Sequence, residues 1–582
     1  MRQFVADFET TTDENDCRVW AFAICEIGNP DNLIIGTTID DFMKWCEVQP
    51  DNVKIYFHNL RFDISFIFNW LFRNEFRHVT SKERESRTFT TVISNRGLFY
   101  ACEVIFYLNG KKVNKVTFWD SMKLIPLSVE EIAKTFKFKE QKLKIDYDAH
   151  NNLPVGAPLT DEEKEYIIHD VRIVAHAIEY FQAQGLDRMT IGSCALNEYK
   201  NLIEKKNFNL WFPVPKSKCH NEIKESYKGG WSYTNPWCIG KEVGCGLVLD
   251  KNSMYPWVMK TKLLPWGTPI FYRGEYKRDP SYPLYVQMIR CQFEIKPGML
   301  PTIQIKHTLG YSGTEYLTSS NFKEETLFLT NIDLELFKKH YNVYNIEYLS
   351  GWKFRGGRGM FDAYIDKWYG KKNDARAEGN SGLEFIAKLY LNNLSGKFGT
   401  SNMIKEKQPY IGEDGAVHYR DSKPEEKNGI YIAMSSFITS YARYEEISCA
   451  QKIEDDFHSG KSKNRFLYGD TDSLHILSPE FEFPEGLQID RFELGAWKVE
   501  GRFRRAKFLR SKCYIEDFTK DMESENPEYA IKVTVAGMPD SCKEQVNFKN
   551  FKIGATYTGK KQPKAVQGGV VLQDIDFSIK KV

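Results

Sequence analysis

Apolar and polar residues alternate along the first forty positions, and this two-residue period predicts short strands over 3–9, 18–28 and 32–39. Residues 62–73 are apolar on nearly every side, which predicts a buried helix. Residues 160–182 predict a second helix, in which Thr160 is the N-cap and Glu163 completes a capping box. With further strands expected over 89–107 and 113–119, residues 1–190 predict one α/β unit.

The remaining chain shows both the two-residue period of strands and the 3.6-residue period of helices. Residues 220–300 favour strands, whereas 382–394 and 429–452 carry helical patterns. Residues 466–477 predict a hairpin, because two apolar strands flank a tight polar turn. The tail from about 536 predicts short strands. At roughly 100–200 residues per domain, a chain of 582 residues predicts three to five folding units.

Composition narrows the class of protein without identifying it. The net charge is only +2, but six cations and no acid lie between Gly501 and Ile515. That stretch suits phosphate groups, with a solvated face as an equal alternative. The twelve cysteines form no CxxC pair, which argues against a structural zinc site. Because no apolar run reaches the ~18 residues of a membrane span, we expect a soluble, intracellular protein with no membrane partner.

Four acids and a tyrosine form the first candidate site. Asp7 and Glu9 are two apart in a predicted strand, so their side chains point to the same face. Asp63 opens the first predicted helix, and Tyr166 and Asp170 share one face of the second. Clustered carboxylates repel each other unless a cation lies between them, and oxygen ligands suit Mg²⁺ or Mn²⁺. Any one of these acids alone could be an ordinary surface residue, but the ordered set predicts a two-metal site that hydrolyses a phosphodiester.

Three aspartates form the second candidate site. Asp250 ends an apolar strand, and Asp470 and Asp472 occupy the turn of the 466–477 hairpin. An isolated Asp-Thr-Asp is most often a plain β-turn, but burying it between aliphatic strands is costly without a cation. A metal site here would activate a primer 3′-hydroxyl toward a nucleotide α-phosphate. Lys388 and Asn392 share one helix face and can meet a triphosphate, although Lys388 by itself would be a surface lysine.

The first set resembles the proofreading 3′→5′ exonuclease motifs of family B DNA polymerases. The DxE motif is Asp7-Phe8-Glu9, the NxxxD motif runs from Asn59 to Asp63, and the YxxxD motif runs from Tyr166 to Asp170. The resemblance implies that the four acids bind the metal ions and that Tyr166 positions the attacking water. It also implies contacts with a single-stranded primer end from His58, Asn59, Phe62, Ser121 and Lys142.

The second set resembles the polymerase core of the same family. The DxxSLYP motif appears as Asp250 to Pro256, with Met254 in place of leucine, and the YxDTDS motif appears as Tyr468 to Ser473. The resemblance implies that Asp250 and Asp472 bind metal ions with Asp470 in support, and that Tyr255 excludes a 2′-hydroxyl.

Further contacts follow from the same resemblance. Lys388 would hold the triphosphate, with Lys372 and Asn392 also at the nucleotide. The KxY motif, Lys512 to Tyr514, would grip the primer terminus. Tyr227-Lys228-Gly229-Gly230 resembles the YxGG motif that joins exonuclease and polymerase domains at the DNA.

Two insertions are similar to those of the protein-primed family B polymerases of small bacteriophages. The stretch between the Asp250 motif and the Lys388 helix is far longer than two finger helices need. The expected fold is multi-domain α/β: a ribonuclease H-like exonuclease domain and a right-hand polymerase with palm, fingers, thumb and two insertions. The expected domains are the exonuclease (1–190), palm (191–261 and 432–535), insertion 1 or terminal-protein region 1 (262–360), fingers (361–398), insertion 2 or terminal-protein region 2 (399–431) and thumb (536–582).

This resemblance implies a DNA-directed DNA polymerase that replicates linear phage DNA. The implied partners are template-primer DNA, dNTPs, single-stranded DNA at the exonuclease site and a terminal protein that supplies the priming hydroxyl. The implied cofactors are two Mg²⁺ or Mn²⁺ ions in each site. Insertion 2 would support strand displacement and processivity. We expect a monomer in the cytoplasm of the bacterial host.

Three positions depart from the family pattern. Ser395 replaces a tyrosine, Glu384 replaces a lysine, and Leu127 replaces an aromatic residue that stacks on single-stranded DNA. For Ser395 and Glu384 we expect changed nucleotide affinity or fidelity, not loss of activity.

Three other interpretations compete with the polymerase. A nuclease with a C-terminal DNA-binding region would have no use for Asp250, Asp472 and Lys512. A non-catalytic replication scaffold would not need every carboxylate. A reverse transcriptase carries a different acidic turn and lacks the N-terminal exonuclease set.

Overall fold

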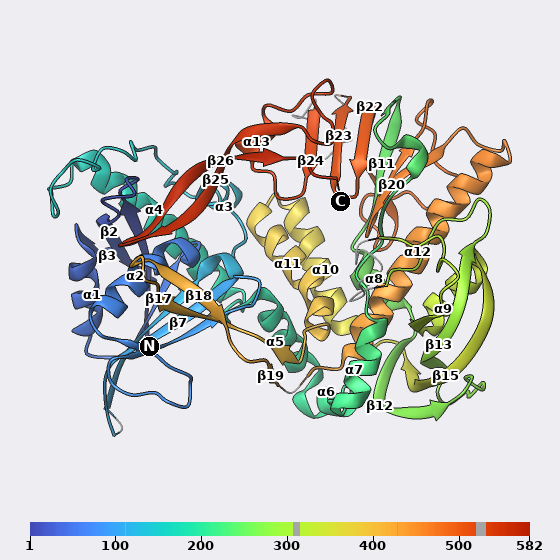
Figure 1. Ribbon diagram of the computed structural model, residues 1–582, viewed down its shortest axis with the longest axis horizontal. Coiled ribbons are helices and arrows are strands. Elements are labelled where there is room, and N and C mark those ends of the chain that lie inside the picture. The colour runs from blue at the N-terminus through green and yellow to red at the C-terminus, as the bar shows by residue number, and fades with distance from the viewer. Residues whose placement is uncertain (111, 306–314, 428, 520–530, 582) are drawn as a thin grey trace.

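The computed structural model describes residues 1–110, 112–305, 315–427, 429–519 and 531–581 (Figure 1). Its N-terminal part is a mixed sheet in the order β3-β2-β1-β4-β8-β7-β6-β5. The strands are β1 (Arg2–Thr10), β2 (Val19–Glu26), β3 (Asn29–Gly36), β4 (Val53–Phe57), β5 (Arg77–His78), β6 (Thr88–Ile93), β7 (Phe99–Asn109) and β8 (Lys112–Asp120). Strand β1 lies between antiparallel β2 and parallel β4, so it is hydrogen-bonded on both edges, and most of its residues are buried.

Helices pack against this sheet. They are α1 (Ile39–Glu47), α2 (Leu60–Arg73), α3 (Val129–Phe136) and α4 (Asp161–Ala183), with a 3₁₀ turn η1 (Ser121–Lys123) after β8. The predicted strands and both predicted helices are confirmed to within a few residues. The capping box of α4 is also present, since Thr160 Oγ1 accepts from the Glu163 N–H and the Glu163 carboxylate accepts from the Thr160 N–H.

A second sheet forms the centre of the other half, in the order β24-β23-β22-β11-β21-β20-β9, with β10 paired to β22. Its strands are β9 (Ser232–Thr234), β10 (Glu242–Val243), β11 (Gly246–Lys251), β20 (Arg465–Asp470), β21 (Ser473–Leu477), β22 (Trp497–Arg510), β23 (Cys513–Phe518) and β24 (Ile531–Val535). Leu247, Leu249 and Ile476 share a core with Ile447 of the long helix α12 (Ile432–His458). Asp250 alternates with these leucines and therefore faces away from α12.

A third sheet, β12-β15-β13-β14, fills the stretch where the sequence predicted an extra unit. It comprises β12 (Leu264–Arg273), β13 (Leu284–Ile295), β14 (Glu325–Thr330) and β15 (Tyr341–Gly357), with α9 (Asn331–His340). Strands dominate 232–295, within the range 220–300 for which the sequence predicted them, and the 3₁₀ turn η2 (Pro236–Cys238) interrupts them. The start of the predicted range is instead the end of helix α7 (Ser217–Ser226). Residues 254–261 instead form helix α8 (Met254–Thr261), because Met254, Val258 and Met259 share one buried face.

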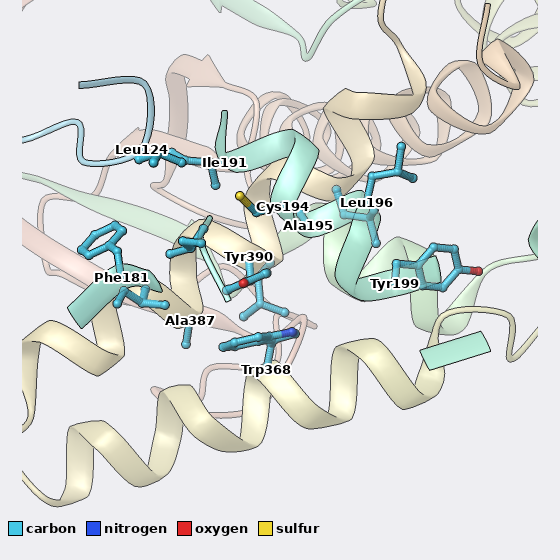
Figure 2. Close-up of a cluster of buried hydrophobic side chains, with 14 of the residues drawn as sticks. Leu124, Phe181, Ile191, Cys194, Ala195, Leu196, Tyr199, Trp368, Ala387 and Tyr390 are labelled. Atoms are coloured by element: carbon cyan, nitrogen blue, oxygen red, sulfur yellow. The ribbon is translucent and has the colours of Figure 1, made fainter. Parts of the chain in front are cut away.

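Helices α10 (Asp362–Ala377) and α11 (Ser381–Phe398) lie side by side and are anchored in a core shared with α4, α5 (Ile191–Ile203) and α6 (Lys205–Trp211). Figure 2 shows Trp368 and Tyr390 in contact there, and their stacked rings are 3.7 Å apart between centroids. The Tyr390 hydroxyl donates to the Gln184 carbonyl at 3.0 Å, and the Tyr364 hydroxyl donates to the Tyr390 carbonyl at 2.7 Å. These contacts fix α11 relative to the N-terminal unit.

Two hairpins reach back to the N-terminal unit (Figure 1). The first consists of β17 (Lys407–Ile411) and β18 (Val417–Asp421). At its base, the flanking short strands β16 (Met403–Ile404) and β19 (Glu425–Glu426) pair with each other. The second follows α13 (Asp540–Lys543) and consists of β25 (Thr556–Val566) and β26 (Gly569–Ser578), longer than the short strands predicted for the tail. A Cβ at Gly569 would lie 2.3 Å from the Phe66 ring, so the hairpin approaches α2 closely. Among the described residues, no helix combines the length and apolar character that a membrane crossing requires.

Candidate active sites

The first site lies where β1, α2 and α4 meet. Strand alternation puts the Asp7 and Glu9 carboxylates on one face, and α4 brings Asp170 to them. Ligand oxygens of these three residues lie within 4.8 Å of one another. Together with Asp63 and Tyr166, they line a cleft of about 920 Å³. The structure therefore brings together all five residues predicted for this site.

The charges in this cleft are unfavourable without a cation. Burial, and secondly the Asp170 charge, raise the pKa of Asp7 to about 7. Burial and the neighbouring Asp7 raise the pKa values of Glu9 and Asp63 well above their ordinary range. Asp170 Oδ1 is buried without a hydrogen-bond partner within the described protein. Three converging carboxylates with one unpartnered oxygen fit a divalent metal ion.

Lys142 lines the same cleft, and its predicted contact with the primer end stays a prediction. Its ammonium group forms an ion pair with Asp170 and lies 3.3 Å from the Tyr166 hydroxyl, so it offsets part of the negative charge of the site. The Tyr147 hydroxyl is also 3.3 Å from the Tyr166 hydroxyl. Sequence reasoning missed Tyr147, because no periodic pattern in its loop marks it.

Three of the residues predicted at the primer end, His58, Asn59 and Phe62, lie at the start of α2, and Ser121 lies in η1. Asn59 has a left-handed backbone with φ 74°, and its N–H donates to Asp120 Oδ1 at 3.2 Å. His58 is held by Ser121 Oγ at 2.9 Å and by the Leu127 carbonyl at 2.7 Å. Phe62 lines the cleft, as do His58 and Asn59. His58 and Ser121 thus orient the first turn of α2, and their contact with DNA stays a prediction.

The second site is built by three adjacent strands. Sheet pairing places Asp250 and Asp470 each opposite Ser473 of β21, and Asp472 lies in the turn between β20 and β21. The Lys251 N–H donates to the Asp472 carbonyl at 2.7 Å, which ties the turn to the end of β11. Burial, followed by the charges of Asp250 and Asp470, raises the pKa of Asp472 to about 7. This donor set also fits a divalent metal ion.

Lysines surround these aspartates. Lys512 Nζ is 2.8 Å from Asp470 Oδ1, and the Tyr468 hydroxyl donates to Asp470 Oδ2 at 3.0 Å. Lys498 Nζ is 3.4 Å from Asp250 Oδ1. Lys498 was missed by sequence reasoning, because its proximity to Asp250 comes from the pairing of β11 with β22.

The YxGG segment supports the turn. A Cβ at Gly230 would lie 2.3 Å from Thr471 Oγ1, and the Thr471 N–H donates to the Trp231 carbonyl at 2.7 Å. Thr471 itself has φ 68°, a left-handed conformation that this contact holds in place. The carbonyls of Lys228 and Gly229 accept hydrogen bonds from Arg443. Tyr227 lies close to Gly399, where an added Cβ would be 2.6 Å from the Tyr227 hydroxyl oxygen.

The predicted nucleotide residues lie on α8, α10 and α11. Tyr255 is packed against the core of the α10–α11 region. Lys372 is 7% exposed, with Nζ 3.5 Å from Ser253 Oγ. Burial and then the nearby cations lower the pKa of Lys372 to about 8. Lys388 is half exposed, and Asn392 is exposed.

The folded chain shows the surroundings of Ser395 and of the basic stretch 501–515. Ser395, which replaces a tyrosine, is buried, and its carbonyl accepts from the Ser435 hydroxyl at 2.6 Å. The basic stretch 501–515 is not a continuous cationic surface, because Asp517 on the paired strand β23 binds Arg504 and Arg505. Tyr514 is buried against Tyr468 and Phe508.

The class of protein that this fold and these two carboxylate sites define is the DNA polymerases. The family model described as DNA polymerase type B, organellar and viral, matches residues 44–157 and 154–481. The chain is 42% identical to the DNA polymerase of Bacillus phage Nf over 100% of both chains, and 42% identical to that of Bacillus phage phi29 over 100% of this chain and 99% of the relative. It is 32% identical to the DNA polymerase of Streptococcus phage Cp-1, over 99% and 98% of the two chains.

Solved structures agree with these sequence matches. The structure titled Phi29 DNA polymerase complexed with primer-template DNA and incoming nucleotide substrates superimposes with a TM-score of 0.92 at 40% identity, over 100% of both chains. Phi29 DNA polymerase complexed with single-stranded DNA gives a TM-score of 0.90. The chain therefore belongs to the type B DNA polymerases of viruses and organelles. The predicted fold class, a multi-domain α/β protein with exonuclease and polymerase domains, is confirmed.

Proposed function

We propose that this DNA polymerase is protein-primed, displaces the non-template strand and proofreads with its own 3′→5′ exonuclease. The observation that carries the proposal is the presence of two carboxylate sites on two separate sheets, one around Asp7 and one around Asp472. One site would remove nucleotides and the other would add them.

At the exonuclease site, Asp7, Glu9, Asp63 and Asp170 would hold two divalent ions, Mg²⁺ or Mn²⁺. Bound ions would supply a water of lowered pKa and neutralise the leaving oxygen. Tyr166, buried and hydrogen-bonded through Tyr147, would orient the attacking water. Lys142, released from Asp170 when the ions bind, would be available for a primer phosphate. His58, Asn59, Phe62 and Ser121 would shape the path of the single strand.

At the polymerase site, Asp250 and Asp472 would hold the two ions, and Asp470 would support them through Tyr468 and Lys512. Tyr255 would lie under the sugar and exclude a 2′-hydroxyl. Lys372, Lys388 and Asn392 would contact the dNTP. Lys512 and Tyr514 would hold the primer terminus. The YxGG residues Tyr227, Gly229 and Gly230 would line the DNA path while supporting the catalytic turn.

We further propose the domain boundaries stated above: exonuclease 1–190, palm 191–261 and 432–535, fingers 361–398, thumb 536–582, and insertions 262–360 and 399–431. Residues 111, 306–314, 428, 520–530 and 582 of these ranges lie outside the described part of the chain. We also propose a terminal protein as primer and the host cytoplasm as the working compartment, on the basis of 42% identity to DNA polymerases of Bacillus phages. Phi29 DNA polymerase structures with primer-template DNA and with single-stranded DNA support those two partners. We expect the protein to act as a monomer.

The hairpin β17–β18 supports the strand-displacement proposal. The ring of Tyr419, on β18, packs against the ring of Phe99 of the N-terminal unit, with 5.5 Å between the centroids. Ala416 forms a β-bridge with Gln567, near the tip of the C-terminal hairpin. The hairpin thus connects the N-terminal unit to β25–β26. A connected rim of protein at this place would separate a downstream duplex and retain the template.

A primer-extension gel tests the proposal. A 5′-labelled primer annealed to a longer template is incubated with Mg²⁺, with and without dNTPs. We expect extension with dNTPs and shortening from the 3′ end without them. Shortening alone would overturn the assignment of Asp250 and Asp472. Extension with no shortening would overturn the exonuclease assignment.

A further inference from the structure

The two finger helices carry several cations around one carboxylate. Lys372 and Arg376 lie on α10, and Lys388 lies on α11, one turn after Glu384. Glu384 Oε1 accepts from Arg376 Nε at 3.0 Å and from Arg376 Nη2 at 2.8 Å, and it lies 3.0 Å from Lys388 Nζ. A single carboxylate oxygen therefore holds both the arginine and the lysine.

The two cations differ in how firmly they are held. The side chains of Arg376 and Glu384 are 20% and 18% exposed, whereas that of Lys388 is 45% exposed. The planar guanidinium contacts the carboxylate through two nitrogens, but the ammonium group makes one contact at the end of a flexible stem. An exposed lysine–glutamate pair four residues apart contributes little free energy. Lys388 is thus the partner that exchanges easily, and Arg376 is the partner that stays.

We propose that Glu384 competes with the triphosphate of the incoming nucleotide for Lys388 and thereby sets the nucleotide affinity. The inference rests on the proposed function in one respect, since it takes Lys388 as a triphosphate contact. On nucleotide binding, the ammonium group of Lys388 exchanges the carboxylate for a phosphate oxygen. Arg376 remains on Oε1, so the half-buried carboxylate keeps a cationic partner.

The surroundings explain why Glu384 opposes binding. Burial is the main cause that lowers the pKa of Lys372; the charges of Arg376, Lys388 and Lys498 lower it further, while the Glu384 charge acts in the opposite direction. The cluster thus presents a positive potential that one carboxylate offsets. Removing that negative charge increases the positive potential that a triphosphate meets.

Single-nucleotide incorporation measured over a range of dNTP concentrations tests the inference. Glu384→Gln keeps the side-chain shape and removes the charge. We expect the dNTP KM to fall by roughly two- to five-fold with kcat little changed, the range that an exposed ion pair supports. The matched control is Glu378→Gln, which removes the same charge from the exposed end of α10 and should leave KM unchanged. An unchanged or higher KM in Glu384→Gln would overturn the proposal.

Lys388→Ala separates this inference from the proposed function. We expect Lys388→Ala to raise the dNTP KM, and we expect the added Glu384→Gln change to lower KM much less in that background, because only its effect on the remaining cations is left. An equal fall in KM with Lys388 absent would overturn the exchange. If Lys388→Ala raises KM but Glu384→Gln does not lower it, the inference alone fails. If Lys388→Ala leaves KM unchanged, the triphosphate assignment fails and the inference falls with it. Unaltered thermal unfolding and primer shortening show that each variant is folded.

Discussion

At the scale of the residue, the size of one side chain controls the geometry of the catalytic turn. Thr471 is held in a left-handed conformation by a hydrogen bond to the Trp231 carbonyl, and its side chain fills the space beside Gly230. The turn can place Asp470 and Asp472 only while residue 230 has no Cβ. A glycine that the sequence assigned to DNA contact therefore also has a positioning role.

Gly230→Ala should reduce synthesis, because the new methyl group would overlap Thr471 and displace the turn. An overpacked site costs about 1–3 kcal/mol, which corresponds to roughly a 10- to 100-fold loss in kcat/KM. Primer shortening should stay normal. Gly244→Ala is the matched control, since an added Cβ there meets nothing within 4 Å and Gly244 is not among the proposed site residues. Equal activities of the two variants would contradict this role of Gly230.

Tyr255→Val should admit ribonucleotides. Removing the ring opens space beneath the sugar, and we expect discrimination between dNTP and rNTP to fall by roughly 10- to 100-fold. The measurement is the ratio of kcat/KM for the two substrates, with Tyr255→Phe as the control that keeps the ring. Unchanged sugar discrimination would remove Tyr255 from this role.

At the scale of the element, helix α10 holds a lysine whose surroundings lower its pKa. The pKa of Lys372 is lowered to about 8, first by burial and then by Arg376, Lys388 and Lys498. The charged form is therefore present below about pH 8 and is lost as the pH rises through that value. Because the charged form would bind the triphosphate, kcat/KM for the dNTP should fall between pH 8 and 9, by up to about ten-fold per pH unit. In Lys372→Arg the fall should move to higher pH, because a guanidinium stays charged; the same profile in both proteins would exclude Lys372 as its cause.

The hairpin β17–β18 should be removable as an element. Replacing residues 406–423 with a short glycine linker keeps the pair β16–β19, and Tyr431 stays in the core. We expect this variant to extend a primer on single-stranded template but to stop at a downstream duplex and to make short products. Full strand displacement by the shortened protein would contradict the proposed role of 399–431.

At the scale of the whole molecule, the two carboxylate sites belong to different sheets and should fail independently. Asp472→Ala should lower synthesis by at least about 10³-fold, because a metal ligand contributes several kcal/mol to the transition state, and should leave primer shortening largely intact. Asp7→Ala combined with Glu9→Ala should have the opposite effect. The gel described above measures both activities, and loss of both by either variant with a normal thermal unfolding profile would show that the sites are not separate.

The sequence by itself determined the secondary-structure elements and the residue pairs that share a face in each candidate site. The strand and helix periods, the capping box of Thr160 and the hairpin around Asp470 all depend on residues close in the chain, so the sequence predicted them. The same holds for the pairs Asp7–Glu9 and Tyr166–Asp170, because two-residue and four-residue spacings fix a shared face. The resemblance to family B motifs then supplied the order of the sites along the chain.

Tertiary structure decided the contacts that join distant segments. The approach of Lys498 to Asp250 follows from strand pairing, the place of Lys142 on Asp170 follows from a loop folding over α4, and the sharing of Glu384 follows from two packed helices. No local period encodes such contacts, because they depend on the register and packing of whole elements. The sequence thus determined which groups are present and which faces they share, while the fold determined the partner of each charge.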